Sequence, residues 1–105
     1  MPEPAAGPSG PGTVVMDVGG DIGALILYTP AAMDGREIEI SRDDAPVARR
    51  THSQVRARHM AAATEYAAVY PGLGAGRYTL WYEQDRPAVT VVITGGHVTS
   101  CHWPA

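Results

Sequence analysis

The sequence predicts an all-β protein, an antiparallel β-sandwich of about seven to eight strands. Short runs rich in β-branched and aromatic residues recur along the 105 residues. Clusters of Gly, Pro and Asp separate these runs at spacings of roughly 8–12 residues, which is typical of sandwiches and barrels. No internal repeat is present.

Residues 1–12 differ in composition from the rest of the chain. They hold four prolines and three glycines, which oppose both helix and sheet ladder, so we expect a disordered tail. They also lack the basic and apolar regions of a signal peptide. Residues 13–105 are expected to form one sandwich domain.

The first three expected strands follow from local pattern. Residues 13–18 are β-branched and apolar, and Gly19-Gly20-Asp21 then signals a turn. Residues 24–29 form an apolar run of strand length that suits a central strand and ends at Pro30. Residues 31–35 are expected to form a loop with one short helical turn. Residues 36–41 alternate strictly, which turns two isoleucines inward and two glutamates outward: Ile38, Ile40, Glu37 and Glu39.

The segment 49–59 permits two interpretations. As a strand it places Thr51, Ser53, Val55 and Ala57 on one face and Arg50, His52, Gln54, Arg56 and Arg58 on the other. As a helix its apolar positions are too sparse to form a stripe. The alternation favours a strand, and a helix over about 54–68 is the alternative. Residues 60–63 are too few to stand alone as a helix, so we expect a connection.

The remaining strands are expected at 65–70, 76–82, 88–93 and 97–103. Pro71 lacks an N–H and the glycines after it accept positive φ, so a turn is predicted to interrupt the chain at 71–76. Residues 83–87 and 94–96 are expected to connect hairpins, and Thr94-Gly95-Gly96 suits a primed turn.

The run Tyr70-Pro71-Gly72-Leu73-Gly74-Ala75-Gly76-Arg77-Tyr78-Thr79-Leu80 resembles the L-x-x-G-x-Y-x-L signature of prealbumin-like sandwiches. These include transthyretin-like, carboxypeptidase-regulatory-like and Cna-B-like domains. The resemblance implies that Leu73 plugs the core, Gly76 turns the corner and Tyr78 points inward. It also implies a closing hairpin over 89–99. One enzymatic branch, the hydroxyisourate hydrolases, ends in Tyr-Arg-Gly-Ser, whereas this chain ends Ser-Cys-His-Trp-Pro-Ala, so that activity is not carried over.

Composition narrows the function classes. The formal net charge is −3, and all eight cationic side chains are arginines that form no large basic patch, so we expect no nucleic-acid partner. No run approaches the roughly 18 apolar residues of a membrane span, and we expect no membrane association. The single cysteine, Cys101, excludes an intrachain disulfide and favours the cytoplasm. No motif indicates a cofactor.

Catalytic and metal sites find little support. His52 and His59 have opposite parity, as do His97 and His102, so neither pair shares a strand face. His97 and Cys101 share a face but lie about 13 Å apart along a strand. Cys101 and its neighbour His102 point apart, so another strand would have to supply a base. We therefore predict no metal ligands and no catalytic residues.

Two surfaces are candidates for binding. The arginine face of 49–59 either pairs with Glu37 and Glu39 as a cross-strand charge ladder or, through Arg56 and Arg58, binds an anionic partner. Trp81 and Trp103, with His97, are expected on outward faces near Val92, where exposed aromatics mark an interface. The alternative is that a loop or the N-terminal segment covers the two tryptophans.

The function that the sequence favours is a non-catalytic binding or accessory module, which contacts a protein partner or a second copy. The alternative is a small hydrolase whose site is assembled across strands from His52, His97, Cys101 and His102.

Overall fold

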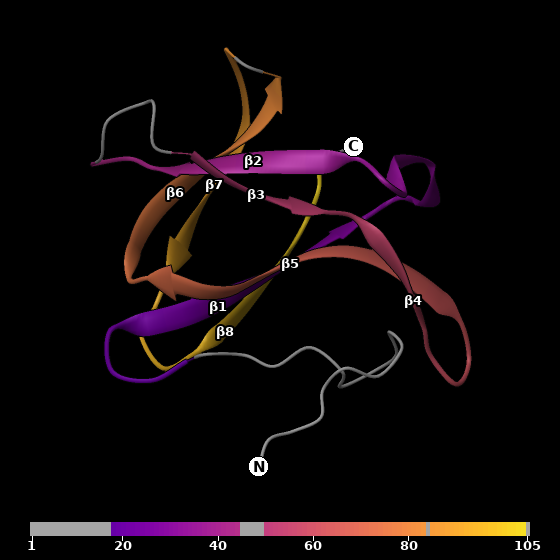
Figure 1. Cartoon of the computed structure of the whole chain (residues 1–105), viewed down its shortest axis with the longest axis horizontal. Helices are drawn as coiled ribbons and strands as arrows, with labels where there is room; N and C mark the ends of the chain where they lie inside the picture. The colour runs from indigo at the N-terminus through magenta and orange to yellow at the C-terminus, as the bar shows by residue number, and fades with distance from the viewer. Residues whose placement is uncertain (1–17, 45–49, 84, 105) are drawn as a thin grey trace.

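The protein is a two-layer β-sandwich, as predicted (Figure 1). The computed structural model describes residues 18–44, 50–83 and 85–104. One sheet has the strand order β4-β5-β1-β8 and the other β3-β2-β6-β7. The elements are β1 (Ile22–Thr29), η1 (Ala31–Met33), β2 (Glu37–Arg42), β3 (Arg50–Gln54), β4 (Arg56–His59), β5 (Thr64–Gly74), β6 (Gly76–Glu83), β7 (Arg86–Ile93) and β8 (Val98–His102).

Most local expectations agree with these elements. The short helical turn expected after Pro30 is the 3₁₀ helix η1, and residues 54–68 are strand and connection rather than helix. The expected tail at 1–12 and strand at 13–18 lie outside the described residues, apart from Val18. In the part of the chain that is described, no helix has the length and apolarity to cross a membrane.

The core lies between the facing sheets. Ile38 and Ile40 point into it from β2 and are essentially fully buried, as the alternation predicted, while Glu37 and Glu39 are exposed. The two layers are also joined by a hydrogen bond, because the Tyr70 hydroxyl on β5 donates to the Ile38 carbonyl over 2.6 Å. This inward–outward pattern leaves polar side chains on the outer faces for contact with solvent or a partner.

The prediction of one strand over 49–59 is wrong, because the chain changes sheet at Val55. β3 pairs with β2 in one sheet, and β4 pairs with β5 in the other. Val55 is buried at the crossing, where its N–H donates to the Arg36 carbonyl and its own carbonyl accepts from the Gly35 N–H. Residues before and after it therefore belong to different sheets.

The prediction that Pro71 ends a strand is also wrong. β5 continues to Gly74, and the β1–β5 register shifts where Pro71 and Gly72 lie opposite Ala24, which is a bulge. β4 pairs only as far as Ala67, so no described strand requires an N–H from Pro71 on that side. The turn into β6 consists of Ala75 alone.

The hairpin predicted around 94–96 is replaced by a crossing between sheets. β7 is an edge strand of one sheet, and β8 lies at the edge of the other, where it pairs with β1 in parallel. The sandwich is thus mostly antiparallel with one parallel pair. The hairpin implied over 89–99 is wrong for the same reason.

The corner at Gly76 has the geometry expected of it. Gly76 has φ +149°, Leu73 is buried, and Tyr78 is 6% exposed with its hydroxyl donating to the Gly74 carbonyl over 2.7 Å. Arg42 closes the corner by donating to the Gly74 and Ala75 carbonyls. Membership in the prealbumin-like group remains a prediction.

Candidate functional site

The two tryptophans do not share an outward patch. Trp81 lies on the outer face of sheet β3-β2-β6-β7, where its indole N–H reaches Ser41. Trp103 follows β8 and packs against the core, as does Cys101. The last strand therefore turns this face inward, and the prediction of an exposed Trp103 is wrong. Val92 is exposed but pairs with Arg77, four residues along β6 from Trp81.

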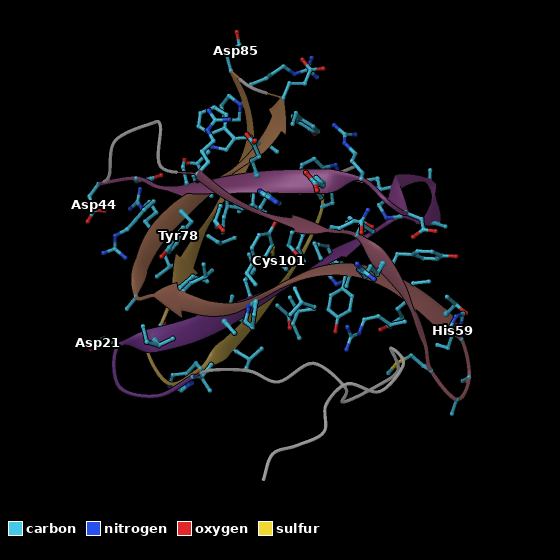
Figure 2. The ribbon with its side chains drawn as sticks, viewed as in Figure 1. Asp21, Asp44, His59, Tyr78, Asp85 and Cys101 are labelled. Carbon is cyan, nitrogen blue, oxygen red and sulfur yellow. The ribbon has the colours of Figure 1, made fainter. Side chains whose placement is uncertain are left out.

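A cleft opens beside Trp81 because two neighbouring strands separate. β2 and β6 pair only from Ile40 with Leu80 to Arg42 with Tyr78, although β2 begins at Glu37 and β6 runs to Glu83. The hairpin of β6 and β7 rises away from β2 beyond this point (Figure 1), and Asp85 marks its tip in Figure 2. The start of β2 and the end of β6 thus form the walls of an opening within one sheet.

The pairing of β6 with β7 is irregular at the same place. The register shifts between Leu80 and Trp81 and again between Trp81 and Glu83, with Pro87 opposite Trp81. Bulges of this kind redirect side chains and are frequent beside functional sites. A carbonyl on each separating strand also accepts a side-chain hydrogen bond: Ile38 from Tyr70, and Tyr82 from the Arg36 guanidinium over 2.9 Å.

The Trp81 cleft is an aromatic depression with an acidic rim. It has a volume of about 340 Å³ and is lined by Glu37, Glu39, Trp81, Tyr82 and Glu83. Glu37 faces only His52, at 4.0 Å, and Glu83 has no cation within 4.0 Å among the described residues. Carboxylates beside aromatic faces attract organic cations.

Trp81 is held in one orientation. Its indole N–H donates to Ser41 Oγ over 2.9 Å, and the Arg50 guanidinium lies 4.0 Å from the ring centre. Arg50 also pairs with Glu39, with 2.9 Å between Nη1 and Oε1. The predicted ladder is therefore confirmed for Arg50, and His52 Nε2 lies 4.0 Å from Glu37 Oε2. A large aromatic that is already fixed loses little freedom on binding.

Tyr82 is supported from behind by Trp103. Their rings meet edge to face with centroids 5.0 Å apart, and the Arg86 guanidinium lies 5.1 Å from the Tyr82 ring centre on the same hairpin. Trp103 is thus connected to the cleft through Tyr82 rather than through Trp81. Its role there is to position the Tyr82 ring.

The predicted binding residues on β4 form a separate surface. Arg56 and Arg58 line a groove of about 290 Å³, the Arg56/Arg58 groove, together with Ser53, Gln54, Ala67, Val69 and Pro71. They lie in the other sheet from Glu37 and Glu39, so the ladder does not include them. His97 lies in the exposed connection between β7 and β8, apart from both surfaces.

The residues of the alternative hydrolase are dispersed. Cys101 points into the sandwich (Figure 2), where burial raises the pKa of its thiol and keeps it protonated. His102 lies on the opposite face of β8 and stacks on Tyr28, while His52 belongs to the other sheet. Within the described ranges no three His, Cys, Asp or Glu side chains are placed to hold a metal. No observation favours a hydrolase.

Sequence reasoning identified Trp81, Glu37 and Glu39 but missed Tyr82 and Glu83. Those two were assigned to a strand end and a connection, although Pro87 offered a signal. A proline inside a strand indicates an edge or a bulge, and here it lies opposite Trp81. The separation of β2 from β6 has no local signal.

Comparison of the chain with protein-family models, curated proteins and solved structures found no match.

Proposed function

We propose that this chain is a non-catalytic binding module of the cytoplasm that contacts a protein partner through the Trp81 cleft. The observation that carries this proposal is the local opening of the sheet, where β2 leaves β6 and the β6–β7 register shifts twice. Both irregularities coincide with a half-buried tryptophan on an outer face. Tryptophan is enriched among the residues that dominate binding energy at interfaces.

The partner group that suits the cleft is a basic side chain. Trp81 and Glu39 already hold the Arg50 guanidinium between ring and carboxylate, which is the chemistry a second cation would meet. Glu83 and Glu37 extend the same rim without a strong ion pair of their own in the described part of the chain. The lining of three glutamates and two aromatic side chains suits recognition of a cationic group.

A photo-crosslinking amino acid at Glu83 tests the proposal in the native host. We expect one dominant crosslinked product that disappears when Trp81→Ser is added, because Glu83 and Trp81 line the same cleft. The same label at Ser100, exposed on the other sheet, is the matched control and should not give that product. The mass of the product distinguishes a second copy from another protein.

Two outcomes would contradict the proposal. One is the absence of any product from Glu83. The other is a product that persists in a Trp81→Ser variant whose circular dichroism spectrum remains that of the folded sandwich.

A further inference from the structure

We infer that the Arg56/Arg58 groove is a second binding surface, which takes an extended acidic segment of a partner protein laid along β4. Arg56 and Arg58 lie on β4, in the other sheet from the Trp81 cleft, and share no lining residue with that cleft. The inference rests on the two arginines and on the open edge of β4.

Among the described residues, the guanidinium groups of Arg56 and Arg58 have no carboxylate partner. Arg56 is exposed and Arg58 is half-buried, and neither lies within 4.0 Å of a described acidic group. Glu65 on β5 is the register partner of Arg58, yet the two side chains form no ion pair. The crossing at Val55 is what removes both arginines from the reach of Glu37 and Glu39.

Strand geometry sets the spacing that a ligand must match. Arg56 and Arg58 are two residues apart on one strand, so their side chains leave the same face about 6.6 Å apart. A partner strand with carboxylates at alternate positions has the same repeat. A guanidinium binds a carboxylate with two parallel hydrogen bonds, which adds direction to the attraction.

β4 can accept such a strand because it lies at the edge of its sheet. It pairs with β5 on one side, and no described strand lies along its other side. An added strand would gain main-chain hydrogen bonds there, with specificity supplied by alternate side chains. In Figure 1 the β4–β5 hairpin extends away from the body of the sandwich, so its edge is open to an approaching segment.

The groove is lined by apolar residues of β5 and by two polar side chains of β3, Ser53 and Gln54, which both donate hydrogen bonds to carbonyls of the protein. Ser53 Oγ donates to the Val69 carbonyl over 2.7 Å. Val69 and Pro71 present apolar surface on β5, and Ala67 is buried beside them. The arginines are therefore the groups left to recognise a ligand on this face of β4.

The experiment is a titration of the full chain with the peptide acetyl-(Glu-Thr)₃-amide, followed by amide chemical shifts. We expect shifts concentrated in Arg56–His59, and protection of β4 amides against hydrogen exchange. Arg56→Gln with Arg58→Gln should weaken binding about tenfold or more, because charge-assisted hydrogen bonds are lost. Added salt should weaken it as well.

Three controls separate this inference from general charge attraction. Arg77→Gln removes an exposed arginine from the other sheet and should leave binding unchanged. The peptide acetyl-(Gln-Thr)₃-amide should not bind. A peptide of the same composition with its three glutamates adjacent should bind more weakly, since its carboxylates do not fall on one face.

The inference is overturned if the acidic peptide produces no shifts in β4, or if Arg77→Gln weakens binding as much as the double variant. Shifts without exchange protection would overturn strand addition. If sedimentation shows that the arginines instead hold two copies together, the partner assignment is wrong. The Trp81→Ser variant should bind the peptide normally, so failure of the Trp81 cleft and failure of this groove are distinguishable.

Discussion

The two ends of β6 differ in what their side chains do. Near Gly76 the strand pairs regularly with β7, and Tyr78 is buried with its hydroxyl bonded to Gly74. Beyond Leu80 the strand leaves β2, its register with β7 shifts, and Tyr82 is only half-buried. Alternation along β6 places both tyrosines on the inward face, so it does not predict that Tyr78 is more deeply buried than Tyr82.

The difference shows that an inward-facing side chain is buried where its strand is paired on both sides, and is left partly exposed where one neighbouring strand is absent. At Tyr78 two neighbouring strands and the corner at Gly76 surround the ring. At Tyr82 one neighbour has gone, and the exposed surface becomes available for binding. The following tests compare the two ends, beginning with the largest expected effect.

Replacing the two tyrosines gives the most direct test. Tyr78→Ala should lower the free energy of unfolding by about 3–5 kcal/mol, the usual loss for a buried large aromatic. Tyr82→Ala should lower it by about 1 kcal/mol, mainly through the lost ring contact with Trp103. Urea unfolding followed by circular dichroism measures both. Equal losses would remove the distinction between the ends.

The corner beside Tyr78 is tested by two glycines. A Cβ at Gly76 would lie 2.9 Å from three guanidinium atoms of Arg42, at a φ that L-residues rarely adopt. Gly76→Ala should therefore cost about 1–3 kcal/mol. Gly74→Ala should cost clearly less in the same unfolding assay, because its Cβ would meet one Arg42 nitrogen at 3.3 Å. The reverse order would show that the corner is not under steric constraint.

The pH dependence of stability tests whether the side chains inside the sandwich are desolvated. Burial raises the pKa of the Cys101 thiol, so the folded state keeps a proton that the unfolded state releases above about pH 8.5. Stability should thus be complete below that pH and fall as pH rises toward the folded pKa. Tyr70 has a raised pKa for the same reason and acts in the same direction at higher pH.

Unfolding of wild type and Cys101→Ala, measured near pH 7 and near pH 9.5, checks the sign. The variant should lose less stability between the two pH values than wild type does. If both lose the same amount, the thiol is not desolvated.

The smallest effect is expected for the ion pair between Arg50 and Glu39 beside the Trp81 cleft. Glu39→Gln removes the charge that meets Arg50, and the half-exposed carboxylate limits the loss to about 0.2–1 kcal/mol. Glu65→Gln, on the other sheet, has no such pair and is the matched control. A change above about 2 kcal/mol in urea unfolding would mean that Glu39 organises the Trp81 cleft and is not an ordinary surface pair.

The sequence by itself determined the fold class, most strand positions and many side-chain faces. Alternation placed Ile38 and Ile40 inward, and it placed Glu37 and Glu39 on the outer face together with Arg50 and His52. It also oriented Tyr78 and Trp81 correctly. These outcomes are local, because successive side chains of any strand point to opposite faces.

Only the tertiary structure decided which strands are neighbours. Val55 divides an alternating run between two sheets, β8 joins β1 in parallel, and β2 separates from β6 beside Trp81. The alternation of side chains has the same period in both sheets. It therefore predicts whether a side chain points inward or outward, but not which sheet the strand joins or which strand it pairs with. Both proposed binding surfaces arise from these pairings, which is why the sequence indicated some of their residues but not their arrangement.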